Sequence, residues 1–332
     1  MVRAFDWRDG ERLIRFGRGV AADAVESLGG PGYALLTTER ALAALPDVGA
    51  AAARLHLVAA GEVPPLAATA LAWAHEENDG RIAALGGGRV VDVAKAVAAG
   101  LGGGARALAI PTTLSGAELT RGHRHAEGVP ESTARVRPAL VLCDPALAAS
   151  QPLDELAASA LNALGHAVEG PCTRSANPVA TLAAHEAARL LVGAFADAAA
   201  DRDALALGAL LAGYTLDSTG LGLHHVLAQT LVRHGLAAHG QSNALLLPHT
   251  IGALGRRFAA EHAALAAAIG EDPAGAAARL CALTGVTRLR DLGVAEAALE
   301  PCVESALARP QLDATPPRPG ADEVLGLYRA AW

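Results

Sequence analysis

The hydrophobic pattern divides the chain near residue 152. Before that point, short apolar runs alternate with Ala-rich helical stretches, and the predicted strands cover residues 33–38, 53–60, 81–88, 106–113 and 138–145. This alternation predicts a parallel sheet with crossover helices. From residue 153 onward the pattern predicts helices only. We therefore expect an α/β domain at residues 1–152, an all-α domain at residues 153–332, and a ligand in the cleft between them.

Composition narrows the class of protein. The chain has 332 residues, 52% of them hydrophobic and 18% charged, with a net charge of −7. These values predict a well-buried globular protein and argue against general binding to nucleic acid or to a membrane surface. No apolar stretch is long enough to span a bilayer, and the polar start of the chain does not resemble a signal peptide, so we expect a cytoplasmic protein. The four cysteines lie far apart and predict neither disulfides nor a zinc framework.

One basic residue stands out from the composition. Among 27 lysines and arginines, Lys95 is the only lysine. Every other position of this kind is an arginine, so the single lysine indicates that position 95 requires a compact ammonium group and not a guanidinium. The alternative is a chance surface lysine.

A glycine-rich turn follows the third predicted strand. The sequence "LGGGRVVDVAKA" runs from a strand through Gly86, Gly87 and Gly88 into a helix. Glycines leave the backbone open to a phosphate, and a helix N-terminus offers free N–H groups to it. The next strand ends in "IPTTLSGAELT", in which Thr112, Thr113 and Ser115 are hydroxyl candidates for phosphate or ribose. The alternatives are a tight strand-to-helix turn and a helix cap.

Several motifs together resemble a known family. The motifs "GGGxxxDxxK", "PTTxSGxE", "NALxHAVE", "GLHH" and "LPH" occur in this order. They resemble the iron-containing (group III) alcohol dehydrogenase family, and within it most resemble the maleylacetate reductases. The resemblance covers nearly the whole chain. It implies a Rossmann-like domain followed by a helical domain (the fold shared with dehydroquinate synthase), a homodimer, and NADH or NADPH as cofactor.

The resemblance also assigns cofactor residues. It implies that the three glycines contact the pyrophosphate, that Asp92 and Lys95 support the loop and the cofactor, and that Thr112, Thr113 and Ser115 lie along the dinucleotide. Many members carry an Asp at the end of the first strand, where this chain has Thr38. A short neutral residue neither repels nor binds a 2′-phosphate, so we expect the protein to use both NADH and NADPH.

The metal site of the family is altered here. In metal-dependent members, an Asp and a His four residues apart bind the metal with two further histidines. These positions fall on Asn162, His166, His225 and His239. The three imidazoles could hold Zn or Fe, but Asn162 removes the anionic ligand. We therefore favour catalysis without a metal, and a merely structural histidine cluster stays an alternative.

Other polar residues near these motifs are candidates for substrate binding. Gln229 occupies a position where the family often has another histidine, and an amide cannot relay protons. Arg121, His123, Arg124 and His125 form a basic stretch that could clamp a substrate carboxylate or simply be a solvated loop. His224 points about 100° away from His225 on a helix, so we treat His224 and His234 as bystanders.

Together these features predict an oxidoreductase acting on CH–OH or CH–CH groups. We expect hydride transfer from NAD(P)H to a small, carboxylate-bearing carbonyl or enone, in a setting that could be biosynthetic. His225 and His239 would polarise the oxygen and supply the proton as imidazolium, and His166 and Asn162 would orient the oxygen. The alternatives are a metal-dependent alcohol dehydrogenase, a sugar-phosphate cyclase or lyase, and a non-catalytic nucleotide-binding protein.

Overall fold

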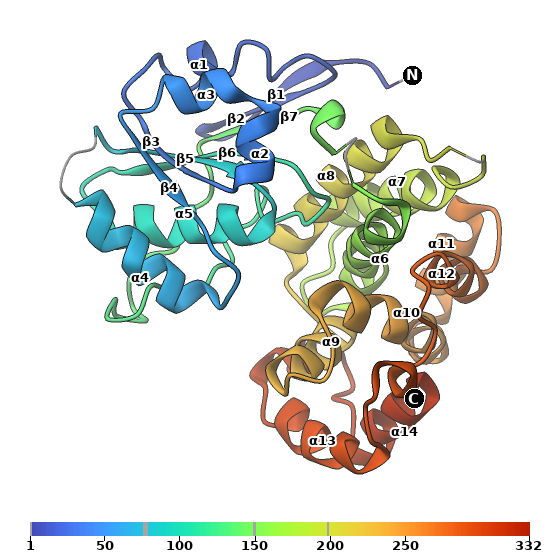
Figure 1. The fold of residues 1–332 in the computed structure, drawn as a ribbon. Helices are drawn as coiled ribbons and strands as arrows, with labels where there is room; N and C mark the ends of the chain where they lie inside the picture. The colour runs from blue at the N-terminus through green and yellow to red at the C-terminus, as the bar shows by residue number, and fades with distance from the viewer. Residues whose placement is uncertain (1, 76–78, 149–150, 198) are drawn as a thin grey trace. The chain divides into compact units, whose positions relative to one another are not determined.

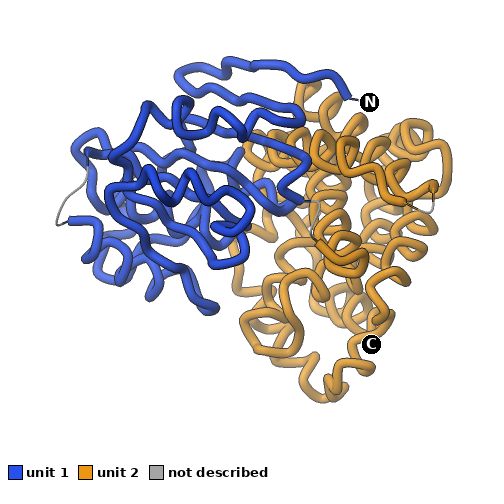
Figure 2. The backbone as a smooth tube through the Cα atoms, turned by 45° about the horizontal axis from the view of Figure 1, so that its top comes forward, with its two compact units in different colours: residues 1–150 blue, residues 151–332 orange. Residues whose placement is uncertain are grey.

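The structure is a computed structural model that describes residues 2–75, 79–148, 151–197 and 199–332. The chain forms two compact units, residues 1–150 and residues 151–332, which are coloured separately in Figure 2. The division lies two residues before the expected end of the first domain at residue 152. The expected fold class, an α/β part followed by an all-α part, is confirmed (Figure 1).

The first unit is built on a seven-stranded sheet with the order β1-β2-β7-β6-β5-β3-β4. The strands are β1 (Phe5–Asp9), β2 (Arg12–Phe16), β3 (Ala34–Thr37), β4 (Arg54–Leu57), β5 (Arg81–Gly86), β6 (Arg106–Pro111) and β7 (Leu140–Cys143). Every pairing is parallel except that of β1 with β2.

The antiparallel strand β1 corrects the prediction of a purely parallel sheet. Asp9 pairs with Arg12, which leaves Gly10 and Glu11 as a two-residue hairpin loop. Gly10 has a φ of 62°, the left-handed conformation that such a loop requires and that glycine adopts without strain. The first strand is only half-buried and rich in charge, so its hydrophobic signal is weak. The Asp-Gly pair was the available sign of the hairpin.

Helices cover both faces of the sheet and make a three-layer unit. Leu36 and Ala84 point to one face, where they pack in one apolar core with residues of α4 (Val63–Ala74) and α5 (Gly88–Leu101). Leu35 and Leu85 point to the other face and pack with residues of α1 (Ala24–Ser27) and α3 (Pro46–Ala50). The short helix α2 (Glu39–Ala44) follows β3 directly. Two-sided burial explains why these strands read as continuous apolar runs.

The carboxyl ends of three neighbouring strands carry the predicted cofactor residues. Thr37 of β3 is in register with Leu85 of β5, and Gly86 is in register with Pro111 of β6. Because parallel strands end at one edge of the sheet, the segments that follow β3, β5 and β6 meet there. This edge therefore gathers Thr38, the glycine turn and the hydroxyl-rich loop after Pro111.

The second unit contains only helices among its described residues. They are α6 (Leu153–Glu169), α7 (Pro178–Gly193), α8 (Arg202–Thr219), α9 (Leu223–Arg233), α10 (His239–Arg257), α11 (Ala259–Ile269), α12 (Pro273–Ala282), α13 (Leu299–Leu307) and α14 (Ala321–Ala331). Short 3-10 turns join them: η2 (Gly170–Cys172), η3 (Leu289–Leu292), η4 (Glu296–Ala298) and η5 (Pro310–Ala314), while η1 (Pro145–Ala148) belongs to the first unit. Helix α6 is central and packs against α7, α8, α9 and α10.

The described helices are short or too polar, one by one, for a membrane span. No single helix in these ranges is both long enough and apolar enough to cross a bilayer. Helices α8 and α9 reach the threshold only as a pair, and they are bent by 97° at the break between them.

Candidate active site

The glycine turn of the first unit fits a dinucleotide pyrophosphate. Helix α5 begins at Gly88 after the N-cap Gly87, and no side chain caps its first N–H groups. A Cβ added to Gly88 would lie 2.7 Å from the Ser115 hydroxyl oxygen, and one added to Gly87 would lie 3.1 Å from Thr113 Cγ2. The glycines are therefore required because the hydroxyl loop packs directly onto the turn. The uncapped amides leave donors for an anion.

Thr38 plays a local structural role at the same sheet edge. Its hydroxyl oxygen accepts a hydrogen bond from the Ala41 amide at 3.3 Å and so caps α2. The preceding Thr37 donates its hydroxyl proton to the Leu85 carbonyl at 2.8 Å. Neither residue brings negative charge to the edge, which agrees with the expected tolerance of a 2′-phosphate. The use of both cofactors stays a prediction.

Lys95 is fully buried, so it is no chance surface lysine. Its ammonium donates to the carbonyl oxygens of Ala117 at 2.8 Å and Gly122 at 2.7 Å, and it pairs with Asp92 at 2.8 Å. It also lies within 3.3 Å of both oxygens of Thr120. These partners saturate the three ammonium protons. Lys95 therefore holds the 117–122 loop in place, while its support of the cofactor stays a prediction.

Glu118 is a buried acid that the sequence analysis did not single out. Only 2% of its surface is exposed, and burial raises the pKa of its carboxyl to about 7, although the nearby Lys95 ammonium acts in the opposite direction. The motif "SGAE" contained this residue. Glu118 lies within the 117–122 loop that Lys95 holds.

We expect the Glu118→Gln variant to lose pH dependence of stability. The folded protein keeps the Glu118 proton up to about pH 7, whereas the unfolded chain releases it near its usual value of 4.5. The free energy of unfolding should then fall as pH rises through this window, by about 3 kcal/mol in total. Urea unfolding from pH 4.5 to 7.5 measures the slope, with the exposed Glu127→Gln as control. An unchanged slope in Glu118→Gln would contradict the assignment.

The predicted basic clamp for a substrate carboxylate stays a prediction, and three of its four residues are buried or already paired within the first unit. His123 donates from Nδ1 to the Arg124 carbonyl at 3.2 Å and accepts at Nε2 from the Val136 amide at 3.4 Å. Burial lowers its pKa to about 4, so its ring is neutral. His125 is also buried, and Arg124 is ion-paired with Glu62. Arg121 is exposed.

The second unit brings the predicted histidines together. Asn162, His166 and Glu169 lie at positions i, i+4 and i+7 of α6 and so share one face of that helix. The rings of His166 and His225 stack with centroids 3.9 Å apart and an angle of 5° between their planes. Gly165 makes room for this, because a Cβ there would lie 2.7 Å from His224 Cδ2.

Glu169 is the functional candidate that sequence reasoning missed. Its Oε1 lies 2.6 Å from His225 Nδ1, and its Oε2 accepts from the His225 amide at 3.3 Å. The carboxyl therefore fixes both the ring and the first turn of α9. The sequence offered only its position in "NALxHAVE", three residues after His166 and on the same helix face. Burial raises the pKa of Glu169.

Electrostatics correct the predicted chemistry of His225. Burial, assisted by the neighbouring His239, lowers its pKa to about 3. Burial and then His225 lower the pKa of His166 well below its usual value. Burial therefore favours a neutral, oriented His225 ring over the imidazolium first expected.

His239 differs from the buried rings because it is exposed at the start of α10. Its Nε2 lies 3.2 Å from the Asn162 side-chain oxygen and 3.3 Å from the Asn243 amide nitrogen. With a proton, Nε2 can donate to Asn162; without one, it can accept from Asn243. Both protonation states thus have a partner, which suits a residue that carries protons.

The remaining polar residues sort by contact. His224 is fully buried, its ring stands at 86° to that of His225, and its Nδ1 lies 2.9 Å from the Thr250 hydroxyl, so its role is structural. His234 is exposed and bonds to Ser305. Gln229 accepts at its side-chain oxygen from Arg309 at 2.6 Å, which leaves its amide protons for another partner.

The cluster of His166, Glu169 and His225 has ring nitrogens free to hydrogen-bond to a ligand, but its geometry does not suit a metal ion. His225 Nε2 and His166 Nδ1 are buried and have no hydrogen-bond partner among the described residues. Donor atoms of His166, Glu169 and His225 lie within 4.8 Å of one another. However, imidazole lone pairs lie in the ring planes, and two nearly parallel stacked rings cannot converge on one ion. Glu169 is already hydrogen-bonded to His225, and Asn162 to His239. This arrangement therefore does not fit Zn or Fe.

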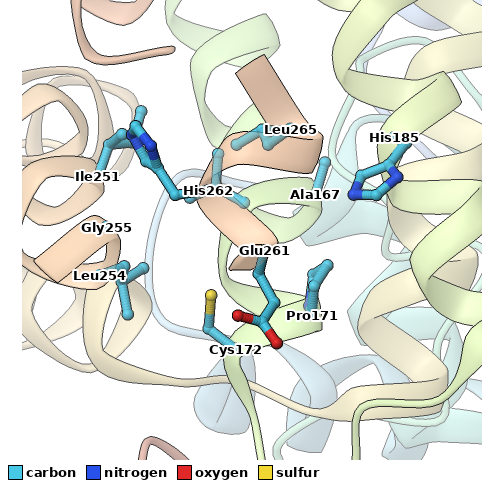
Figure 3. Close-up of a pocket in the computed structure, with 11 residues that line it drawn as sticks. Ala167, Pro171, Cys172, His185, Ile251, Leu254, Gly255, Glu261, His262 and Leu265 are labelled. Carbon is cyan, nitrogen blue, oxygen red and sulfur yellow. The ribbon is translucent and has the colours of Figure 1, made fainter. Parts of the chain in front are cut away.

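A separate cavity beside α6 is too small to hold substrate. It is lined by residues of α6, α10 and α11, with Cys172, Glu261 and His262 around it (Figure 3). Its volume of about 10 Å³ suits at most a single water molecule.

Comparisons with known proteins show the family of the chain. A family model described as "Fe-containing alcohol dehydrogenase family, C-terminal" matches residues 156–332. Maleylacetate reductase 2 of Cupriavidus pinatubonensis is 35% identical over 254 residues, which is 73% of this chain and 70% of that protein. The crystal structure of maleylacetate reductase from Agrobacterium tumefaciens has a TM-score of 0.84 and 28% identity, covering 100% of this chain and 99% of that one. The crystal structure of a putative alcohol dehydrogenase from Ralstonia eutropha has a TM-score of 0.85 and 30% identity, covering 100% of this chain and 98% of that one. The chain therefore belongs to the iron-containing alcohol dehydrogenase family of NAD(P)-dependent oxidoreductases.

Proposed function

We propose that the protein reduces a small, carboxylate-bearing carbonyl or enone with NADH or NADPH, and that it does so without a catalytic metal. The observation that carries the proposal is the buried Glu169–His225 pair, whose Nε2 has no hydrogen-bond partner among the described residues. The maleylacetate reductases named above support a substrate of the carboxylate class. We assign NAD(P)H binding to residues 1–152 and substrate binding to residues 153–332.

The histidine cluster orients the acceptor oxygen and supplies the proton. When bound, NAD(P)H supplies the hydride. Glu169, whose pKa burial raises, donates its proton to His225 Nδ1, so that the neutral ring keeps its hydrogen on Nε2 and donates it to the acceptor oxygen. His166 stacks on one face of the His225 ring. His239 brings a proton from solvent, and Asn162 orients it.

The setting of the enzyme follows from the same resemblance. We propose a cytoplasmic homodimer whose only ligands are the cofactor and a small-molecule substrate, with no role for nucleic acid or a membrane. The acidic net charge of −7 supports this assignment.

Substrate class is tested by the oxidation of NADPH and NADH with matched acceptors. The acceptors are a keto diacid, an unsaturated keto diacid, their methyl esters, and a simple aldehyde. We expect kcat/KM for the diacids to exceed that for the esters by about 10-fold or more, the equivalent of one charge-assisted contact. Reduction of the aldehyde alone would favour the alcohol dehydrogenase alternative, and no oxidation with any acceptor would overturn the proposal.

Metal independence is tested on the same preparation. Because the stacked rings cannot converge on one ion, we expect purified protein to hold far less than one Zn or Fe per chain by elemental analysis. A chelator should leave kcat unchanged, and added zinc or iron should not raise it. Activity that is lost to the chelator and restored by one metal would refute the metal-free part, while leaving the substrate class standing.

A further inference from the structure

The C-terminal unit has a polar hollow formed by the end of α9, the end of α13 and η5, which contact one another. Figure 1 shows α9 and α13 as neighbours. Its volume is about 550 Å³, which lies within the range of small-molecule sites. The lining residues are Thr230, Arg233, His234, Ser305, Ala308, Arg309, Pro310 and Gln311. We call it the arginine hollow because Arg233 and Arg309 line it. None of these lining residues is acidic.

Arg309 is a buried cation without an anionic partner among the described residues. It is 8% exposed, and its guanidinium donates to the Val226 carbonyl at 3.2 Å and to the Gln229 side-chain oxygen at 2.6 Å. Both acceptors are neutral. The nearby Asp313 is paired with Arg318 instead. Burying a guanidinium costs free energy that neutral acceptors offset only in part.

Arg233 adds a second positive charge at the rim. It is exposed and forms no ion pair within the described part of the chain. Burial, and then Arg233, lower the pKa of Arg309, which places the two charges within electrostatic reach of each other. Two neighbouring guanidinium groups repel unless an anion lies between them. His234 and Ser305, joined at 2.8 Å, add an imidazole and a hydroxyl to the same hollow.

We propose that the arginine hollow is an oxyanion site for a small molecule bearing a carboxylate or phosphate group. Arg309 and Arg233 bind the anion through their planar N–H forks, and Ser305 adds a hydroxyl donor. This inference concerns residues outside the histidine cluster and does not depend on the proposed function.

The hollow lies beside the helix that also carries His225. His225, Gln229 and Arg233 lie at i, i+4 and i+8 of α9, so they follow one face of it over a rise of about 12 Å. Arg309 binds Gln229 midway along this face. The anion can therefore be the far carboxylate of a long substrate or a separate effector, and both sources use the same chemistry.

Inorganic phosphate and succinate are the probes, titrated into the whole protein by calorimetry at constant ionic strength. Saturating NAD⁺ is present so that the glycine turn is occupied. We expect binding at one site per chain, weakened about 10-fold or more by Arg233→Gln, an exposed position that should fold normally. Arg309→Lys keeps the charge, loses the fork, and should also weaken binding. Arg189→Gln, an exposed arginine of α7, is the matched control.

Kinetics then separate the two sources. If the hollow takes the far carboxylate of the substrate, Arg233→Gln raises KM for a diacid but not for the matching mono-acid, and phosphate competes with the diacid. If it takes a separate effector, phosphate binds without competing. Either pattern supports the site. Undetectable binding, or equal binding by Arg233→Gln, Arg309→Lys and the wild type, overturns it.

Discussion

Replacing His225 with alanine is expected to lower kcat/KM by about 1,000-fold, within the range measured for positioned catalytic side chains. His225 Nε2 is buried without a hydrogen-bond partner among the described residues, and its Nδ1 is fixed by Glu169 at 2.6 Å. The ring thus has a single free polar atom for the acceptor oxygen. Steady-state reduction of the best diacid measures the effect.

Two further variants make this result specific. Glu169→Gln keeps the shape and removes the carboxylate, so it should give a smaller loss of kcat than His225→Ala. The affinity for NAD(P)H, measured by fluorescence titration, should stay unchanged in both, because the glycine turn belongs to the other unit. His75→Ala, at an exposed position of the first unit, is the control. Full activity in His225→Ala would remove this residue from the mechanism.

Replacing Lys95 with methionine is expected to lower the free energy of unfolding by about 3 kcal/mol. The substitution keeps an apolar stem and removes an ammonium that is 0% exposed, leaving Asp92 and the carbonyls of Ala117 and Gly122 without their donor. The 117–122 loop then loosens, so NAD(P)H affinity should fall as well. Urea unfolding and cofactor titration measure the two effects.

An exposed ion pair provides the matched comparison. Arg189 pairs with Glu186 at 2.6 Å at the same i, i+3 spacing, but 53% and 45% of these side chains are exposed. Arg189→Met should change stability by less than about 0.5 kcal/mol. Equal losses in Lys95→Met and Arg189→Met would mean that the buried ammonium has no special role.

The fold was largely predictable because two-sided burial gives strands an unmistakable apolar run. The strands expected at 33–38 and 81–88 are observed as β3 and β5 with trimmed ends. The hairpin of β1 and β2 was missed because its polar edge strand carries little hydrophobic signal.

The site was predictable where spacing along a helix decides it. Asn162 and His166 share a face of α6, as their separation of four residues requires. Contacts between distant segments were not predictable, since no local pattern reveals that Glu169 meets His225 or that Arg309 meets Gln229. The sequence also did not reveal that Arg124 pairs with Glu62, so the basic residues at 121–125 were interpreted as a clamp for a carboxylate.

The central claim is hydride transfer from NAD(P)H to a carboxylate-bearing acceptor without a metal. Its most direct test follows deuterium from NADPH labelled at the nicotinamide C4 into the product of an unsaturated keto diacid, by mass spectrometry. The protein is first dialysed against chelator. We expect one deuterium per product molecule, formed at the rate of untreated protein. Transfer that occurs only after zinc or iron is restored, or no transfer at all, would contradict it.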